Sequence, residues 1–358
     1  NLDGGDYVVV RVEEQGQSAL TVLQETLPGL ITGIRFIKSM RWNESGVAFS
    51  RPIRWILALH GKTVVPFTYA GIVSDRKTRG LRFEGPREQG VDAPLDYLPQ
   101  IESKGILLSP ADRQTEILAQ VEALAAEVGG RVPDDPGLLE EVTHMVEKPT
   151  AFRGTFDSSY LAILPPEVLV SVMKKHQRYF VLEDEAGKLL PYFIGVRNGG
   201  SEHIDNVIDG NEQVILARFD DAAFFVQKDL QKSLEDFVPE LKTLTFQVKL
   251  GSFLDKTERI VELTKTLGMG LKCNQSEMDL AERAAHLCKA DLATNMVVEM
   301  TSLQGSMGRY YALKSGETNE VAQASFEHYL PRSADDQLPK TKPGLVVALA
   351  DRLDSLIG

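Results

Sequence analysis

The chain has 358 residues, enough for roughly two or three domains, and an ordinary composition for a soluble globular protein. Its net charge of −12 excludes nonspecific polyanion binding by the whole surface, and no apolar run is long enough to span a bilayer. Two cysteines, Cys273 and Cys288, exclude a disulfide framework and favour a reducing compartment. The start at Asn1 and the end within an expected helix predict a piece of a longer polypeptide.

The N-terminal part combines a predicted strand, a predicted helix and a basic stretch. Residues 7–12 alternate as in a strand, and residues 18–27 are expected to form a helix. Between residues 31 and 82 there are ten Lys or Arg residues but only two acids, Glu44 and Asp75. A local basic field on an acidic protein is typical of directed nucleic-acid contact.

Six cations of this stretch are candidate phosphate-binding residues: Lys38, Arg41, Arg51, Arg54, Arg79 and Arg82. Gly80, between the last two, allows close approach of a ligand to the backbone and so favours phosphate contact over simple solvation. Two tryptophans could stack on bases. The neighbours of Trp55 favour core packing, whereas Trp42 is open to either interpretation.

Several elements on either side of this stretch are expected to serve packing alone. Residues 53–59 alternate as a half-buried strand, and Gly61-Lys62 turns it into a second strand at residues 64–67. Residues 109–128 and 135–146 carry helical periodicity with caps and a proline stop. Their acids are expected to form a solvated face, and we assign them no chemistry.

The most informative stretch is residues 165–196. Pro166 suits a first helical turn, and apolar residues then recur at helical spacing: Val168, Leu169, Val172 and Met173. In a continuous helix Lys174 and Arg178 share a face, while Lys175 points about 100° away. A hairpin is expected to follow, with strands at residues 179–182 and 189–196.

The three cations at the end of this helix allow two interpretations. They could simply stabilise the helix dipole, or form a ridge aimed at a polyanion beside the ring of Tyr179, a second candidate for stacking on a base. His176 lies at the edge of the apolar stripe, where a half-buried structural histidine is favoured over a catalytic one.

The remainder of the chain is predicted to be largely helical, with a domain boundary near residues 228–233. Gly199-Gly200 lacks the spacing of a dinucleotide loop. The expected helices are residues 211–225, 234–249, 255–267, 276–298, 320–329 and a last one from about 343.

A metal-dependent phosphohydrolase is the alternative function for the helical half. Its candidate metal ligands are His286, Asp291, Glu299, His328 and Asp351. His286 and Asp291 are five residues apart and would lie about 140° apart around a straight helix, and Lys289 would repel a metal ion. We therefore predict no metal site and no catalytic residue.

The chain resembles the β subunit of the bacterial-type, two-component glycyl–tRNA synthetase. The organellar form of this enzyme in a plant is one source that the resemblance allows. The matching segments follow in order over most of the chain: residues 38–42, 51–55, 78–80, 165–168, 173–180, 196–199, 249–251, 289–292, 307–312, 327–331 and 348–351. The segment Met-Lys-Lys-His-Gln-Arg-Tyr-Phe at residues 173–180 is among the longest and most specific.

The resemblance implies an α+β chain. Residues 1–230 would form a mixed α/β, tRNA-contacting domain similar to the B3/B4 region of phenylalanyl–tRNA synthetase β chains. Residues 231–358 would form an all-α, HD-like domain. Active HD phosphohydrolases have a His-Asp pair where this chain has Ala290-Asp291, while Asp351 matches their last aspartate.

The resemblance also implies a tRNA-binding, noncatalytic role in attaching glycine to its tRNA. The ATP and Mg used in the reaction would bind to the α portion, and this piece would bind no cofactor. Its partners would be glycine tRNA and a separate or fused α part, in a hetero-oligomer or fused-chain dimer with no membrane contact. A bacterial protein would be cytoplasmic, and a plant one would lie in the chloroplast or the mitochondrial matrix. A scaffold whose basic field docks the α part is a further alternative.

Overall fold

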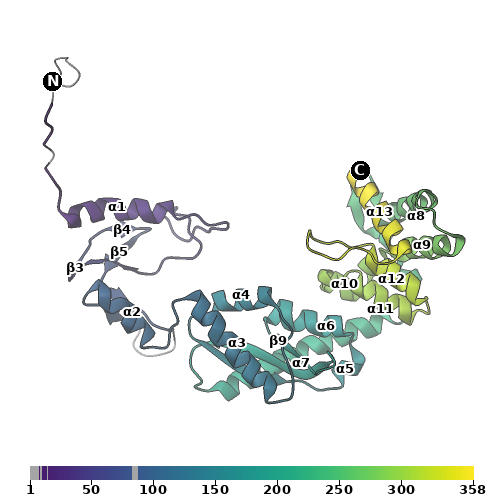
Figure 1. Cartoon of the computed structure of the whole chain (residues 1–358), viewed down its shortest axis with the longest axis horizontal. Helices are drawn as coiled ribbons and strands as arrows, with labels where there is room; N and C mark the ends of the chain where they lie inside the picture. Colours follow the sequence, from purple (N-terminus) through teal and green to yellow (C-terminus); the bar gives the residue numbers. More distant parts are fainter. Residues whose placement is uncertain (1–7, 9, 14, 83–87) are drawn as a thin grey trace, which may run out of the picture. The chain divides into compact units, whose positions relative to one another are not determined.

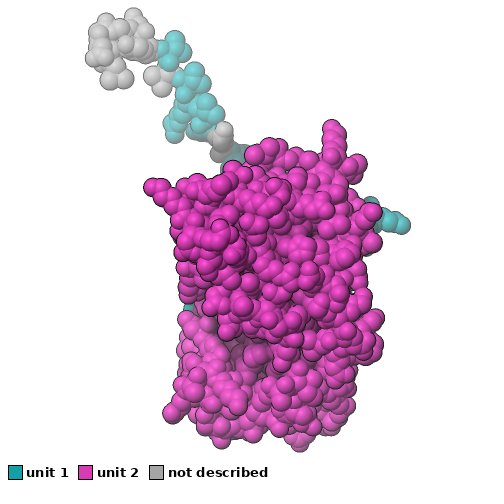
Figure 2. Space-filling view, turned by 90° about the vertical axis from the view of Figure 1, so that its right-hand side faces the viewer, with its two compact units in different colours: residues 1–113, 198–200 teal, residues 114–197, 201–358 magenta. Residues whose placement is uncertain are grey.

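The computed structural model describes residues 8, 10–13, 15–82 and 88–358 (Figure 1). The chain divides into two compact units, coloured separately in Figure 2. Unit 1 comprises residues 1–113 and 198–200, and unit 2 comprises residues 114–197 and 201–358. No helix in the described ranges combines the length and the apolar character that crossing a membrane requires.

Unit 1 contains small sheets and two helices. Helix α1 (Ala19–Gly33) begins at Ser18, whose hydroxyl accepts a hydrogen bond from the Thr21 N–H. The main sheet has the order β1-β5-β4, and two short hairpins accompany it. The strands are β1 (Ile56–Leu57), β2 (Leu59–His60), β3 (Thr63–Val64), β4 (Thr68–Tyr69), β5 (Ile72–Asp75), β6 (Lys77–Thr78) and β7 (Gln89–Gly90), followed by helix α2 (Pro94–Glu102).

The core of unit 1 lies between α1 and this sheet. Apolar residues recur at helical spacing on one face of α1: Leu20, Leu23, Leu27 and Ile31. They pack against buried side chains of the strands and their connections: Val65, Phe67 and Tyr69. The buried hydroxyl of Ser74 donates to the Val65 carbonyl at 2.7 Å and accepts from the Phe67 N–H at 2.9 Å. It thereby satisfies backbone groups that this core removes from water.

The first part of unit 2 is a three-stranded sheet covered on both faces by helices. Its strands have the order β8-β10-β9. Phe180, Leu182 and Ile194 belong to the core beneath α3 and α4, whereas Val181 and Phe193 belong to the core shared with α6 and α7. The elements are α3 (Pro110–Ala126), α4 (Pro136–Met145), β8 (Pro149–Thr155), α5 (Tyr160–Ile163), α6 (Pro166–Ser171), the π-helical turn η1 (Val172–His176), β9 (Phe180–Glu183), β10 (Leu189–Asn198) and α7 (Ile204–Asp229).

The second part of unit 2 is a helical layer whose core is continuous with that of α6 and α7. Asp229, at the end of α7, accepts hydrogen bonds from the Met296 N–H at 3.0 Å and the Tyr311 hydroxyl at 2.8 Å. The elements are η2 (Leu234–Phe237), η3 (Pro239–Thr243), β11 (Thr245–Gln247), β12 (Gly251–Ser252), α8 (Phe253–Gly270), α9 (Gln275–Leu287), η4 (Ala290–Ala293), α10 (Asn295–Glu299), η5 (Thr301–Leu303), α11 (Ser306–Lys314), α12 (Asn319–Glu327) and α13 (Lys342–Ile357).

The predicted mixture of helices and small sheets is confirmed, as are both predicted hairpins. The helix predicted at residues 234–249 is wrong, because Pro239 starts a separate 3₁₀ turn and Thr245–Gln247 forms a strand. The helix predicted at residues 276–298 is broken after Leu287 by the turn η4. The strand expected at residues 7–12 includes positions outside the described residues. The predicted domain boundary near residues 228–233 falls inside unit 2 and stays a prediction.

Two glycines in unit 2 leave room for aromatic rings in the sheet. A Cβ atom added at Gly154 of β8 would lie 2.3 Å from the ring of Phe193, and one at Gly195 of β10 would lie 2.4 Å from the ring of Phe152. Each ring therefore occupies the place that a side chain on the neighbouring strand would fill. Both phenylalanines are buried, at 0% and 4% exposure, so neither ring can move aside into water.

We expect Gly154→Ala to destabilise unit 2 by about 1–3 kcal/mol, because overpacking a dense core forces neighbouring side chains out of their preferred rotamers. The matched control is Gly210→Ala in α7, where an added Cβ meets no atom within 4 Å, and this variant should gain about 0.5–1 kcal/mol. Urea unfolding followed by circular dichroism measures both. Equal stability of the two variants would show that the sheet has room for a methyl group.

Candidate nucleic-acid interface

Helix α6 passes directly into the wider turn η1, which redirects the cations at its end. The predicted apolar stripe is confirmed, with each residue at most 1% exposed: Val168, Leu169, Val172 and Met173. The prediction that Lys174 and Arg178 share a helical face is wrong, because residues 172–176 are π-helical and Arg178 takes a φ of 57°. An extra residue in the turn shifts every following side chain around the axis.

Two of the three predicted cations are engaged in ion pairs with α4 or its N-cap. Lys174 Nζ lies 2.8 Å from Asp135 Oδ2, and each side chain is 26% exposed. Burial raises the pKa of Asp135, but the hydrogen bond from Lys174 contributes to a net lowering. Arg178 Nε lies 2.9 Å from Glu141 Oε1, in a pair with 39% and 48% exposure. An exposed pair of this kind is weak, so Arg178 can exchange Glu141 for a phosphate more easily than Lys174 can leave Asp135.

Four basic residues around η1 form what we call the η1 cationic cluster: Lys175, His176, Arg178 and Arg218. Lys175 and Arg218 are exposed, and no ion pair joins either of them to a residue within the described ranges. Partial burial, followed by the charges of Arg218, Arg178 and Lys175, lowers the pKa of His176. His176 is itself exposed, so the half-buried position predicted for it is wrong. Mutually repelling charges at an exposed helix end are suited to an oxyanion ligand.

In unit 1, five of the six predicted cations are exposed: Lys38, Arg41, Arg51, Arg54 and Arg82. Arg41 Nε donates to the Gly46 carbonyl at 3.0 Å, which fixes its side chain against the turn. No side-chain contact holds Lys38 or Arg54 to the part of the chain that the structure describes.

Arg79 and Trp55 form a polar–aromatic platform on unit 1. The guanidinium carbon of Arg79 lies 5.2 Å from the centre of the Trp55 ring, and Arg79 Nη2 lies 3.1 Å from Glu88 Oε1. Trp55 is 42% exposed, so the prediction that it packs in the core is wrong. Trp42 is half-buried and packs against the core of this unit. The exposed indole with its stacked guanidinium is therefore the better surface for a nucleotide base.

Tyr179 belongs to the core and does not face solvent. It is 5% exposed, its ring stacks on Phe193 at 4.5 Å between centroids, and its hydroxyl donates to Asn211 Oδ1. Burial raises the pKa of this hydroxyl to about 12. A ring that is buried and already stacked on a core neighbour cannot accept a base, so we leave Tyr179 out of the candidate interface.

The five candidate metal ligands do not converge. His286 is 42% exposed in its side chain and faces Glu235 at 3.7 Å, and Glu299 is exposed on α10. Asp291 is buried, accepts the Gly305 N–H at 2.5 Å, and has a pKa raised by burial to about 6. His328 is fully buried, its Nδ1 bonds the Ser325 carbonyl, and burial lowers its pKa well below the usual value.

Asp351 is held by two ammonium groups where an HD-type metal ion would need room. Its carboxylate lies 3.0 Å from Lys256 Nζ and 2.9 Å from Lys289 Nζ. Burial opposes its ionisation, but these two charges outweigh burial and lower the pKa of Asp351 to about 2. In the described ranges no three His, Cys, Asp or Glu side chains gather as a metal would require. The residues at this position do not fit a divalent cation.

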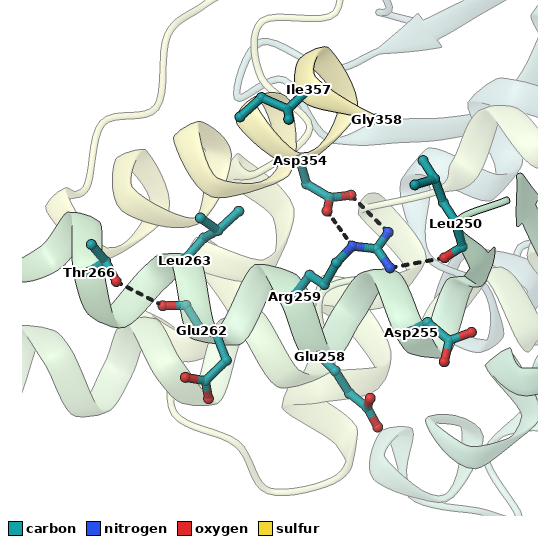
Figure 3. Close-up of a pocket in the computed structure, with 10 residues that line it drawn as sticks. All are labelled: Leu250, Asp255, Glu258, Arg259, Glu262, Leu263, Thr266, Asp354, Ile357 and Gly358. Carbon is teal, nitrogen blue, oxygen red and sulfur yellow. Dashed lines mark hydrogen bonds and ion pairs between the residues drawn. The ribbon is translucent and has the colours of Figure 1, made fainter.

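A cavity in the helical part of unit 2 has a different character. It measures about 770 Å³, lies between α8 and α13, and is lined by the carboxylates of Asp255, Glu258 and Glu262 (Figure 3). Arg259 is the cation in this lining, and its guanidinium is occupied by Asp354 at 2.6 Å and the Leu250 carbonyl at 3.0 Å (Figure 3). Three carboxylates beside one arginine that is already paired repel phosphate, so we leave this cavity out of the candidate interface.

The roles of Arg218 and Lys256 escaped the sequence reasoning, as did the exposure of Trp55. Arg218 joins the η1 cationic cluster through the packing of α7 on η1, which no local pattern reveals. Lys256 lies nearly a hundred residues before the carboxylates with which it pairs. Nothing in its local sequence distinguishes it from a lysine on a helix surface. Trp55 lies just before the short strand β1, which begins at Ile56, so the alternation that favoured its burial does not extend to it.

Lys256 is expected to be essential for the stability of unit 2. Lys256→Met leaves Asp351 and Asp354 with fewer buried counter-ions and should cost about 3 kcal/mol or more. The control Lys265→Met removes an exposed pair with Glu262 and should cost at most about 1 kcal/mol. Circular dichroism in urea is the measurement, because both tryptophans lie in unit 1. A loss for Lys256→Met as small as that for the control would show that this network is dispensable.

Comparison with known proteins connects these surfaces to a family. A family model described as "Glycyl-tRNA synthetase beta subunit" matches residues 1–358. The chain is 47% identical over 353 residues to the glycine–tRNA ligase beta subunit of Desulforamulus reducens, and 46% identical over 356 residues to that of Moorella thermoacetica. The Bacillus subtilis protein of the same name is 43% identical over 355 residues.

Each of these alignments covers 99% of this chain and 51–52% of the relative. The chain therefore spans about half the length of the curated relatives it matches. With a family model over the whole chain and identities of 43–47%, this chain belongs to the glycyl-tRNA synthetase beta subunit family.

Proposed function

We propose that this chain is a tRNA-binding, noncatalytic portion of a glycine–tRNA ligase. The observation that carries the proposal is the η1 cationic cluster, where exposed Lys175 and Arg218 raise a positive field at His176 without a counter-ion among the described residues. Family membership supplies the nucleic acid that such a field would hold, namely glycine tRNA. Attachment of glycine, with its ATP and Mg, would take place in the α portion.

Each unit contributes its own surface to this proposal. In unit 2 the η1 cationic cluster supplies phosphate contacts, with Lys174 a weaker candidate because Asp135 holds it. In unit 1, Trp55 and Arg79 form the stacking platform. The candidates for phosphate contact in this unit are its exposed cations: Lys38, Arg41, Arg51, Arg54 and Arg82. Contacts of this kind position RNA without reading its sequence, so tRNA identity would be read partly elsewhere.

The proposed assembly follows from the same role. The partner is an α subunit or a fused α part, in a hetero-oligomer or a fused-chain dimer. The proposed compartment is the cytoplasm for a bacterial source, and the chloroplast or mitochondrial matrix for a plant source. A metal-dependent phosphohydrolase is disfavoured by the two ammonium groups at Asp351. A scaffold that docks the α part with its basic surfaces is separated from RNA binding by the experiments below.

We expect the double variant Lys175→Gln, Arg218→Gln to bind glycine tRNA about tenfold or more weakly, with a salt dependence shallower by about two in the log–log slope. The affinity falls because two phosphate contacts are lost, and the salt dependence becomes shallower because fewer counterions are released on binding. Filter binding over a range of salt concentrations measures both quantities, while glycyl-adenylate formation by the α part should be unchanged.

The matched control for this pair is Lys265→Gln, Lys314→Gln, which removes the same charge from the helical part of unit 2. This control should keep its tRNA affinity. If the cluster variant binds tRNA like the wild type but loses the α part, the scaffold role replaces the RNA-binding role.

The chain has two tryptophans, so Trp42→Phe leaves Trp55 as a single fluorescent probe. We expect glycine tRNA to quench its emission, because an exposed indole that stacks on a base loses fluorescence. The reciprocal variant Trp55→Ala should retain the half-buried Trp42 with little response, and should bind tRNA more weakly by the loss of one stacking contact, about 1–3 kcal/mol. Full affinity in Trp55→Ala would remove this platform from the interface.

A further inference from the structure

A second cavity in the helical part of unit 2 has no role in the proposed RNA binding. It measures about 530 Å³, within the range of roughly 300–1,000 Å³ that small-molecule sites occupy. Its walls come from β11, α8, α10 and α13, with the loop residues Lys289, Gln304 and Tyr329 between them. All of these residues belong to one compact unit, so the cavity is a property of that unit alone.

The wall of this cavity contains two ammonium groups that are almost completely removed from solvent. Lys256 is 2% exposed and Lys289 is 4% exposed. Burying a charged amine is unfavourable unless its N–H groups find acceptors. The N–H groups of Lys256 are fully used, by the Asp351 carbonyl at 3.4 Å, by Asp354 Oδ2 at 2.9 Å and by the Ser355 hydroxyl at 2.8 Å.

Lys289 is different, because most of its donors are unused. Its Nζ donates to Asp351 Oδ2 at 2.9 Å and lies 4.5 Å from the centre of the Tyr329 ring. The described residues give it no further hydrogen-bond acceptor, so two of its three N–H groups lack one. A buried ammonium group at a cavity wall with two unused donors is a binding point for a ligand oxygen.

The charge of the lining favours an anion. The ion-pair network at its wall has one positive charge in excess, because Lys256, Lys289 and Arg259 are cationic while Asp351 and Asp354, which pair with them, are anionic. The rest of the lining is apolar or neutral. Phe246, Phe253 and Val298 offer surface for a flat ring, and Thr245 and Gln304 offer neutral hydrogen-bonding groups.

We propose that this cavity binds a free nucleoside monophosphate, with the phosphate on Lys289 and the base against the apolar wall. The site binds without metal and without reaction, since ammonium groups occupy the place beside Asp351. This inference is independent of the proposed RNA-binding role, which uses other residues.

Isothermal titration calorimetry of the purified chain with AMP, adenosine and inorganic phosphate tests the proposal. AMP should bind with one-to-one stoichiometry, and adenosine about tenfold or more weakly, as expected for the loss of a charge-assisted hydrogen bond. Lys289→Met should weaken AMP by a similar factor and leave adenosine unchanged. Equal binding of AMP and adenosine, or no binding of AMP or phosphate at millimolar concentration, overturns the proposal and leaves a cavity filled by solvent only.

A second variant keeps the test independent of the ion-pair network. Val298 lines the cavity yet is 59% exposed, so Val298→Phe can fill the space without disturbing the core. It should abolish AMP binding with unchanged thermal stability. The control Val214→Phe, at a 41% exposed position on α7, should bind AMP like the wild type. Undiminished AMP binding by Val298→Phe would place the ligand elsewhere and refute the assignment.

Discussion

The buried carboxylate of Asp351 is the constraint on which the helical part of this protein depends. A charge removed from water must be matched nearby, and here the ammonium groups of Lys256 on α8 and Lys289 beyond α9 supply the match. These contacts join α13 to α8 and to the turn after α9. The same pairing fixes the chemistry of the region, because two lysines fill the space that a divalent cation would require.

The break of the helix after Leu287 follows from a constraint of the same kind, because the buried carboxylate of Asp291 also needs partners. A continuous helix through residues 276–298 would carry Asp291 away from the backbone N–H groups of Gly305 and Gly308. Turn η4 instead directs that carboxylate into the turn before α11, where a Cβ atom on Gly308 would come within 3.0 Å of it. Local helix propensity is worth a few tenths of a kcal/mol per residue, and it gives way to the cost of an unsatisfied buried charge.

The sequence alone was sufficient wherever short-range pattern determines structure. The apolar stripe at residues 168–173, the hairpins and most helices after residue 250 have their causes within a few residues. The candidate interface was less accessible, since its charges depend on contacts across the fold. The π-turn η1 gives no signal in composition, and it turns Lys174 toward Asp135 while it leaves Lys175 exposed. Arg218 and Lys256 acquire their roles only through helices that pack from distant parts of the chain.

The acidic character of the chain makes its few cationic surfaces more selective. A net charge of −12 repels RNA at long range, and carboxylates such as Glu258 and Glu262 line the cavity between α8 and α13. At short range the η1 cationic cluster reverses that sign, because no ion pair with another described residue cancels the charges of Lys175 and Arg218. A polyanion can therefore approach in few orientations, and each incorrect orientation meets negative charge. Long-range repulsion and local attraction together favour one docking geometry, as the proposed role of positioning RNA requires.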